Sequence, residues 1–280
     1  MISIFEVNRI AGEKGISPGI IEKDYVLSKM LWCFSSLKFL YNNLVFKGGT
    51  VLRKFYFHHW RYSEDLDFSS IIVPTVEQMS EAVEETKTLL MDEFGVVIEV
   101  GKPHVVFGEA GKVAYIEFIL KYTGPLRKSS NVKSSFRLDI TCDEMVINPT
   151  NTQKSLSEYS DDKEFTLKVY SLTEILAEKL RSVLQRRKSR DYYDVWRILK
   201  YHQNEIDADA VRDVFKTKLR HREIEFPAVE TFFDKSHLNT VRAYWERGLA
   251  HQIDQLPDFD TAISEYEELT KTFFKKMENV

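Results

Sequence analysis

A glycine pair after a short apolar run, followed by two aspartates at alternate positions, constrains this chain more than any other feature. The pair is Gly48-Gly49, it is followed by Thr50, and Asp65 comes fifteen residues after that threonine with Asp67 two residues beyond. A turn of small residues lets backbone N–H groups approach a phosphate. Two carboxylates at positions i and i+2 of a strand point to one face, where they can share a divalent cation. Together the motifs predict a metal-dependent enzyme that handles a nucleoside triphosphate.

The surrounding residues predict a strand, a glycine turn, a helix and a second strand. Residues 44–46 are typical of a short buried strand, and residues 50–57 predict the start of a helix. Residues 65–69 predict a strand whose Leu66 and Phe68 face the core. Either motif alone is usually an ordinary turn or a solvated strand edge, so it is their order that indicates a site.

With this pattern the sequence resembles the nucleotidyltransferase superfamily, in which a glycine pair precedes Asp-x-Asp on the next strand. The flanking residues are similar to the AbiEii/AbiGii abortive-infection toxin family, although the glycine-to-aspartate spacing is slightly longer than in the general superfamily pattern. This similarity is carried by residues 46–52, 61–67 and 190–194 and by Glu-Lys-Asp-Tyr at 22–25, and it covers about residues 17 to 200. It implies a metal-dependent nucleotidyltransferase toxin of a toxin–antitoxin or abortive-infection phage-defence system.

The resemblance also implies roles for residues at the motif positions. Asp65, Asp67 and a third acid on a later strand would hold Mg²⁺ or Mn²⁺. The nucleotide would be bound by residues around the glycine turn, in the loop before Asp65 and in a later helix: Lys47, Gly48, Gly49, Thr50, Ser63, Arg190 and Asp194.

Asp139 is the expected third acid. In the predicted strand 132–142, alternate apolar side chains form one face and leave Arg137 and Asp139 on the other. In nucleotidyltransferases the third acid comes from such a neighbouring strand. The alternative is a surface aspartate paired with Arg137 or a nearby lysine, and Asp143 and Glu144 in the following turn compete for the role.

Lys179 lies within the apolar stripe of a predicted helix that begins at Ser171 with a capping-box pattern. Burying a lysine is unfavourable unless an anion or a carboxylate meets its ammonium. Either the stem packs while the ammonium reaches solvent, or the ammonium points into the active-site cleft at a triphosphate. We prefer the second interpretation because toxins of the resembled family have an essential lysine in this helix. A Lys179→Met variant would then fold as well as the wild type but lose transfer activity.

The next predicted helix places acids near the same inward face. Asp191 lies on that face, so we expect Lys179 and Asp191 to converge on the cleft as catalytic residues. For Asp194 at the edge of the face, the helix dipole explains an acid equally well. Residues 186–188 and Arg190 form the densest basic cluster. It suits nucleotide or RNA phosphates, although such runs are usually solvated surface.

The resemblance completes the predicted reaction, which transfers NMP from an NTP to an RNA hydroxyl, with a tRNA 3′ end as the leading acceptor. Lys179 would neutralise charge on the departing pyrophosphate. Two alternatives stay open: a toxin or regulator that binds GTP or another NTP without turnover, and a transferase that modifies a protein side chain. The resembled toxins are encoded beside an antitoxin. Control without a stable toxin–antitoxin complex is expected, and therefore a monomer.

Composition limits the class of protein. A net charge of −4 argues against a protein that coats nucleic acid nonspecifically, but not against a local basic site. No window approaches the roughly eighteen apolar residues of a membrane span, and the N-terminus lacks a signal-peptide pattern. We therefore expect a cytoplasmic protein without a membrane partner. The two cysteines, Cys33 and Cys142, lack metal-ligand spacing and are expected to be reduced and buried.

The order of predicted elements indicates an α+β fold, with a nucleotidyltransferase-like mixed sheet and flanking helices followed by a helical C-terminal half. We place an α/β domain at residues 1–165 and a helical domain, which completes the active-site cleft, at 166–280. Helices are expected at 18–34 and 76–94, strands at 96–100, 104–107, 113–122 and 132–142, and a turn or linker at 148–152.

Two further groups of residues have no predicted catalytic role. His58 and His59 lack spaced partner ligands and are expected to end the helix after the glycine turn. Lys23 and Asp24 are expected to form a structural ion pair.

Overall fold

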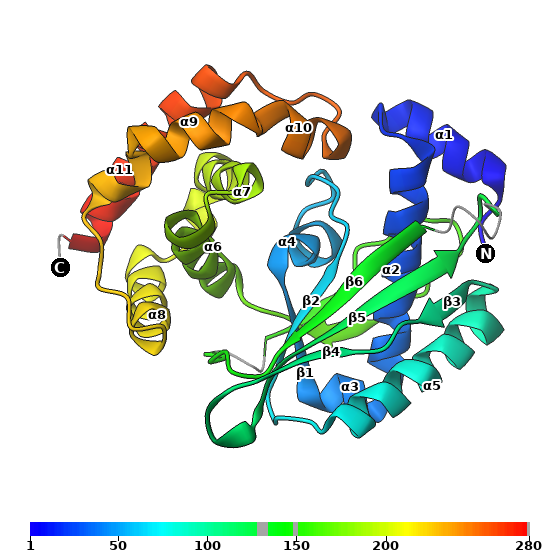
Figure 1. The fold of residues 1–280 in the computed structure, drawn as a ribbon. Helices are drawn as coiled ribbons and strands as arrows, with labels where there is room; N and C mark the ends of the chain where they lie inside the picture. The colour runs from blue at the N-terminus through cyan, green and yellow to red at the C-terminus, as the bar shows by residue number, and fades with distance from the viewer. Residues whose placement is uncertain (128–133, 148–150, 279–280) are drawn as a thin grey trace. The chain divides into compact units, whose positions relative to one another are not determined.

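The computed structural model describes residues 1–127, 134–147 and 151–278, which form two compact units, Met1–Tyr170 and Ser171–Val280 (Figure 1). The first unit is a mixed α/β structure and the second is helical, as the α+β prediction requires. The boundary falls five residues after the one expected from the sequence.

A mixed sheet forms the centre of the first unit. Its strand order is β1–β2–β6–β5–β3, with β4 also paired to β5. β2 and β6 run parallel, whereas the other pairs are antiparallel. The strands are β1 Leu44–Lys47, β2 Leu66–Ser70, β3 Val97–Val100, β4 His104–Phe107, β5 Val113–Thr123 and β6 Ser134–Thr141. Residues 132–133 of the predicted 132–142 strand lie outside the described residues.

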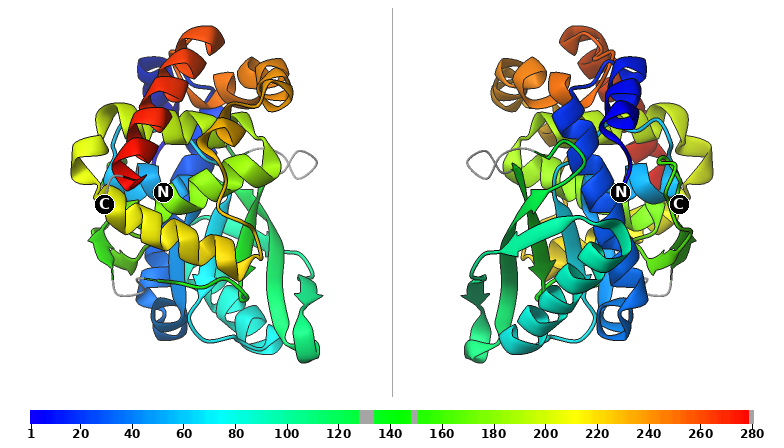
Figure 2. Two further views of the ribbon diagram at one scale, coloured as in Figure 1. Left: turned by 90° about the vertical axis from the view of Figure 1, so that its left-hand side faces the viewer. Right: turned by 90° about the vertical axis from the view of Figure 1, so that its right-hand side faces the viewer.

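Two long helices, α2 (Pro18–Ser36) and α5 (Val76–Phe94), pack beside the sheet (Figures 1 and 2). Phe34 of α2 stacks on Phe68 of β2 with ring centroids 5.1 Å apart, so the apolar sides of helix and sheet share one core. Their predicted ends are close to the observed ones: α5 begins after a Thr75 capping box and ends at left-handed Gly95, and α2 begins at a proline. The short helix α3 (Lys38–Asn43) leads into β1.

The N-terminal helix α1 (Ile4–Lys14) was not predicted. Ser3 caps it by accepting a hydrogen bond from the Glu6 amide, and Gly15 ends it in the left-handed conformation. The hairpin of β7 (Thr152–Lys154) and β8 (Thr166–Lys168) was also missed. Thr152 therefore belongs to a strand instead of the predicted turn at 148–152, of which residues 148–150 lie outside the described residues.

From Ser171 to residue 278, the last that the structure describes, the regular elements are all helices, as predicted. They are α6 Leu172–Arg186, α7 Ser189–Tyr201, α8 Ala208–His221, α9 Lys235–Ala243, α10 Trp245–Leu249 and α11 Phe259–Glu278, with short 3₁₀ turns at Gln203–Glu205, Val229–Phe233 and Ala250–Gln252. Phe232 and Phe274 are buried in the core of this unit with ring centroids 5.0 Å apart. Within the described part of the chain, no helix has the length and hydropathy needed to cross a membrane.

Candidate active site

The glycine pair lies at the point where β1 becomes a helix. Helix α4 (Gly48–Val51) follows β1 directly and continues as a π-helical turn, Leu52–Tyr56, so the helix begins two residues earlier than predicted. Gly48 has φ +82°, a conformation that favours glycine, and a Cβ added there would lie 2.4 Å from Asp67 Oδ2. Glycine therefore allows the backbone at the start of the helix to lie against the Asp67 carboxylate.

Gly49 and Thr50 of the same turn contact the loop before β2. A Cβ at Gly49 would lie 2.5 Å from a guanidinium nitrogen of Arg61, a buried residue to which the sequence argument assigned no role. The buried Thr50 hydroxyl donates to the Asp65 carbonyl oxygen over 2.7 Å. The hydroxyl thus holds the backbone of the Asp-x-Asp segment in place, and the role of Thr50 in nucleotide binding stays a prediction.

Polar side chains form a row across four strands. Asp67 of β2 and Asp139 of β6 are register partners, so Asp139 lies on the strand next to Asp67, as expected for a third acid. Lys47 is the register partner of Asp67 on β1, and Glu117 is that of Asp139 on β5. The alternate residues of β2 and β6, such as Leu66, are buried on the other face. Alternation within β5 places Glu117 on the polar face of the sheet, but only the pairing of β5 with β6 places it beside Asp139.

Asp139, a member of this row, has a raised pKa. Burial raises its pKa to about 6, the hydrogen bond from Tyr115 opposes that rise, and the charge of Asp67 adds to it. The Tyr115 hydroxyl donates to Asp139 Oδ1 over 2.6 Å and lies 3.4 Å from Glu117 Oε2. A half-buried carboxyl that is reluctant to ionise beside other acids is one that a bound cation would stabilise in its charged form.

Asp65 lies just before β2 and contacts Arg137. The sequence argument considered Arg137 as a partner of Asp139, but its guanidinium Nη2 lies 2.6 Å from Asp65 Oδ2. Among the described residues, no group of three or more His, Cys, Asp or Glu side chains is arranged to hold a metal ion. The joint role of Asp65, Asp67 and Asp139 as metal ligands therefore stays a prediction.

Two predicted nucleotide-binding residues lie close to the acids. Lys47 is buried, and its ammonium lies 3.1 Å from the Thr141 hydroxyl on the polar face of β6. Ser63 is half-buried in the loop that leads to Asp65. Both therefore lie near the Asp-x-Asp segment, and their roles in nucleotide binding stay predictions.

The ion pair expected between Lys23 and Asp24 is not the one observed. Lys23 pairs with Glu64 over 2.7 Å, whereas the buried Asp24 accepts hydrogen bonds from Lys54 at 2.5 Å and Arg53 at 3.3 Å. Adjacent residues of a helix do not face each other, so the side chains of Lys23 and Asp24 do not pair with each other. The expected bracing role is right for Asp24, because Arg53 and Lys54 belong to the π-helical turn that continues from the glycine pair.

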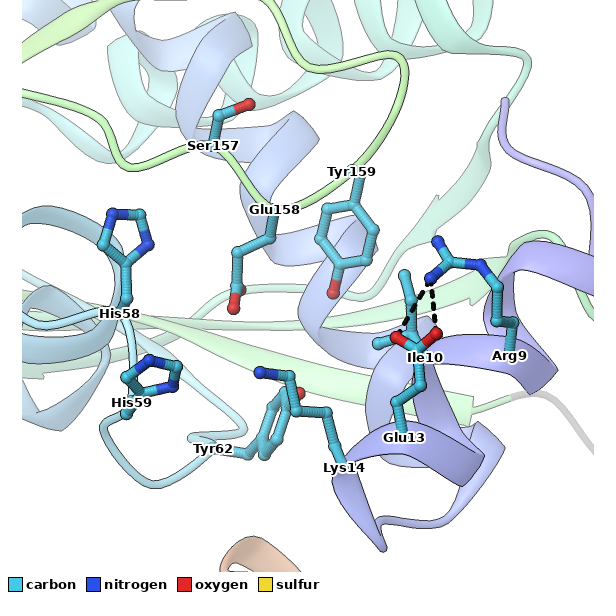
Figure 3. Close-up of a pocket in the computed structure, with 10 residues that line it drawn as sticks. All are labelled: Arg9, Ile10, Glu13, Lys14, His58, His59, Tyr62, Ser157, Glu158 and Tyr159. Atoms are coloured by element: carbon cyan, nitrogen blue, oxygen red, sulfur yellow. Dashed lines mark hydrogen bonds and ion pairs between the residues drawn. The ribbon is translucent and has the colours of Figure 1, made fainter.

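His58 and His59 follow the π-helical turn, as predicted, and line a cavity of about 300 Å³ (Figure 3). α1 contributes the facing side, including an Arg9–Glu13 ion pair of 2.8 Å. The cavity does not include the carboxylate row. Its lining residues are Arg9, Ile10, Glu13, Lys14, His58, His59, Tyr62, Ser157, Glu158 and Tyr159.

Lys179 meets two carboxylates within the second unit. Its ammonium lies 2.9 Å from Asp191 Oδ1 and 2.8 Å from Asp194 Oδ2, and both aspartates are fully buried. Asp191 Oδ2 also accepts from Arg186 Nε over 2.9 Å. Although burial alone would raise the pKa of Asp191, Lys179 and Arg186 lower it. Lys179 and Asp191 thus meet each other, and their roles toward a nucleotide stay predictions.

The remaining predicted residues are only partly as expected. Residues 186–188 are exposed and Arg190 is half-buried, but Arg186 is partly neutralised by Asp191. Cys33 is buried as expected, whereas Cys142, at the end of β6, is only half-buried. Both cysteines are free thiols.

Comparison with known proteins identifies the family and a similar fold. The chain matches the family model of the nucleotidyl transferase AbiEii toxin, type IV toxin–antitoxin system, over residues 30–265. Its fold resembles MenT4, a nucleotidyltransferase toxin from Mycobacterium tuberculosis H37Rv, with a TM-score of 0.67 and 20% identity over 100% of this chain and 91% of that chain. No curated protein sequence matches the chain. Because the family model spans most of the sequence, this chain belongs to the AbiEii family of nucleotidyl transferase toxins of type IV toxin–antitoxin systems.

Proposed function

We propose that this protein is a toxin that transfers NMP from an NTP to an RNA hydroxyl, with a tRNA 3′ end as the acceptor. The observation that carries the proposal is the placement of Asp67 and Asp139 as partners on parallel strands, with the Gly48 backbone against the Asp67 carboxylate. This arrangement brings backbone N–H groups suited to phosphate next to carboxylates suited to a divalent cation.

Asp67 and Asp139 of the polar row, together with Asp65, have the carboxylate oxygens that Mg²⁺ or Mn²⁺ prefers as ligands. Asp67 on β2, Asp139 on the adjacent β6 and Asp65 just before β2 would supply the oxygen ligands, and the raised pKa of Asp139 supports a site where added positive charge is favourable. A divalent cation bound to them would neutralise phosphate charge and lower the pKa of the attacking hydroxyl. The chain's own residues orient the substrate, with the backbone of Gly48 and Gly49, the Lys47 ammonium and the Ser63 hydroxyl as donors to the phosphates.

The family resemblance assigns the remaining roles in this proposal to residues after Ser171. Lys179 neutralises the charge that develops on pyrophosphate, and Asp191 and Asp194 fix the position of its ammonium. Arg190 binds the nucleotide. The family resemblance supports these assignments, because it predicts an essential lysine in the helix that begins after Ser171.

A labelling experiment tests the proposal. The purified protein is incubated with Mg²⁺, each α-labelled NTP in turn, and either total tRNA or total protein. Label is expected on tRNA and to require the divalent cation. Label on protein would instead identify a transferase of side chains, and NTP binding without transfer would identify a binding toxin or regulator; either result would contradict the proposal.

The variant Asp67→Asn provides the matched test of the site. It keeps the shape of the side chain but removes a charge that the cation needs, so transfer should fall by at least about a hundredfold, since even second-shell changes at metal sites cost about ten- to a hundredfold. Expression of the wild type should slow bacterial growth and expression of the variant should not. Asp92→Asn, at an exposed position of α5, is the control and should behave like the wild type.

A further inference from the structure

Arg137 holds both oxygens of Asp65. Its backbone N–H donates to Oδ1 over 3.1 Å, its Nε donates to Oδ1 over 3.4 Å, and its Nη2 donates to Oδ2 over 2.6 Å. The parallel register causes this, because Leu66 pairs with Leu138 and so the preceding residues, Asp65 and Arg137, also lie side by side. The carboxylate of Asp65, the first acid of the Asp-x-Asp pair, is therefore already paired with the positively charged side chain of Arg137.

This pair is at the surface and can separate. The Arg137 side chain is 47% exposed and the Asp65 side chain is 18% exposed. Ion pairs with such exposure contribute only about 0 to 1 kcal/mol, because water screens them. By contrast, the Lys179 pairs in the second unit are almost fully buried. The contact at Asp65 is thus one that a competing cation can displace.

A divalent cation and the Arg137 guanidinium compete for the same carboxylate. Both are positively charged, so they repel each other if both are near Asp65. Arg137 precedes Asp139 by two residues on the polar face of β6, which places it about 7 Å along the strand from the second carboxylate column. A guanidinium matches phosphate oxygens as well as it matches a carboxylate, and a triphosphate that arrives with the cation brings such oxygens to this face.

We propose that Arg137 neutralises Asp65 in the nucleotide-free protein and moves to a phosphate of the NTP when the cation and the nucleotide bind. This inference rests on the proposed function, since it assumes that Asp65 and Asp67 bind the cation. It assigns Arg137 two opposite effects. Arg137 weakens the binding of the cation to the nucleotide-free protein and strengthens the binding of the nucleotide. The cation and the nucleotide then strengthen each other's binding. The cation frees Arg137 from Asp65 for the phosphate, and the phosphate keeps Arg137 away from the carboxylate that the cation binds.

Arg137→Ala separates the two effects. Binding of Mn²⁺ to the nucleotide-free protein, measured by titration calorimetry, should become about fivefold tighter, as expected when a half-exposed ion pair no longer competes. Binding of non-hydrolysable α,β-methylene NTP analogues in the presence of Mg²⁺ should become about tenfold weaker, because a charge-assisted contact is lost. Arg137→Lys, which keeps the charge without the planar fork, should bind Mn²⁺ like the wild type and the analogues with intermediate affinity.

Lys121→Ala is the matched control. Lys121 is an exposed lysine of β5, its register partner is Ser135, and its side chain lies on the same sheet face as Glu117. Removal of its charge should change neither affinity appreciably. If Lys121→Ala tightened Mn²⁺ binding as much as Arg137→Ala, the effect would come from net charge, and the assignment to Arg137 would be overturned.

A different result is expected if the Arg137–Asp65 contact only stabilises the fold. Arg137→Ala would then lower the melting temperature and leave Mn²⁺ binding unchanged or weaker. Unchanged or weaker Mn²⁺ binding would overturn the inference. If the wild type transfers labelled NMP but Arg137→Ala binds Mn²⁺ no more tightly, the proposed function stands and the inference falls. If the wild type binds neither Mn²⁺ nor the analogues, both fall.

Discussion

At the scale of single residues, Lys179 is predicted to be catalytic, but its observed contacts serve the fold. Its ammonium contacts Asp191 and Asp194, and all three side chains are at least 93% buried, since their exposed fractions are 7%, 0% and 0%. Removal of one partner from a buried ion pair is strongly destabilising, because a buried charge is left without compensation. The position therefore cannot be treated as an apolar site that happens to hold a lysine.

Lys179→Met is consequently expected to destabilise the protein by about 3 kcal/mol or more at neutral pH, instead of folding as well as the wild type as the sequence alone suggested. Thermal unfolding at pH 7 measures this. The lowered pKa of Asp191 contributes stability above its ordinary value of 3.8 that is lost as the pH falls through the pKa of the folded protein. The difference between wild type and variant should thus shrink below about pH 4.

The exposed lysine of α11, Lys276, provides the control, and Lys276→Met should melt with the wild type. A Lys179→Met variant that also melted with the wild type would show that the two aspartates do not need its ammonium. The transfer assay is then read only on variants whose folded fraction is known.

The sequence could place side chains on a face but could not choose their partners. Alternation within one strand was enough to put Asp139 on the polar face, and the register with Asp67 confirms it. The partner of Arg137 could not be chosen in that way, because Asp65 lies 72 residues away and the contact depends on the register of β2 against β6. Glu117 was missed for the same reason.

At the scale of elements, the junction of β1 and α4 sets the distance between backbone and carboxylate. Gly48 has φ +82°, and the next residues continue as helix without a loop. Because strand and helix are directly joined, the turn has little freedom to adjust when a side chain is added. The geometry at Asp67 therefore depends on one missing Cβ.

Gly48→Ala tests this dependence. The left-handed conformation costs a non-glycine residue about 1 to 2 kcal/mol, and the new Cβ would lie 2.4 Å from Asp67 Oδ2 unless the carboxylate moves. We expect a folded protein with weaker Mn²⁺ binding and transfer reduced by about a hundredfold, the effect of a displacement near 1 Å at a reacting centre. Titration calorimetry and the labelling assay measure the two effects.

Gly12→Ala is the matched control for that substitution. Gly12 lies in α1, where an added Cβ meets no atom within 4 Å. Alanine there should leave activity unchanged and stabilise the protein by about 0.5 to 1 kcal/mol, because it restricts the unfolded chain. Normal Mn²⁺ binding by Gly48→Ala would count against a role for the glycine junction.

Elements with strong local signals were predictable, and elements held by distant contacts were not. The Thr75 capping box and Gly95 define α5 from the sequence alone. The three-residue strands β7 and β8 are too short for alternation to show, so their pairing gives no local signal. α1 did carry signals, because Ser3 and Gly15 cap it, and attention to these caps would have found it.

At the scale of the whole molecule, contacts with β1 determine where the first unit ends. Val169 forms an isolated bridge with Phe46, the Tyr170 amide donates to the Phe46 carbonyl, and the Tyr170 hydroxyl lies 2.8 Å from Ser69 Oγ. These contacts attach the segment after β8 to β1 and to the neighbouring strand β2, both more than a hundred residues earlier. Composition near residue 165 could not show this, so the predicted boundary came too early.

Assembly is the last prediction at this scale. The large apolar side chains that are exposed include Phe5 of α1, Ile72 in the loop after β2 and Phe107 of β4, which lie in separate segments of the first unit. Exposed apolar residues in separate elements are normal for a monomer. Together with the family resemblance, which implies control without a stable toxin–antitoxin complex, this favours a monomer of 32.8 kDa.

Sizing chromatography with light scattering measures the assembly, on the protein alone and on the protein co-expressed with the product of the adjacent gene. Elution at the monomer mass is expected in both cases, with equal transfer activity per mole of toxin. Co-elution in a stoichiometric complex that has lost transfer activity would contradict the expectation. The helices after residue 200 would then be the first surface to mutate, because neither the proposed reaction nor the cation site assigns them a role.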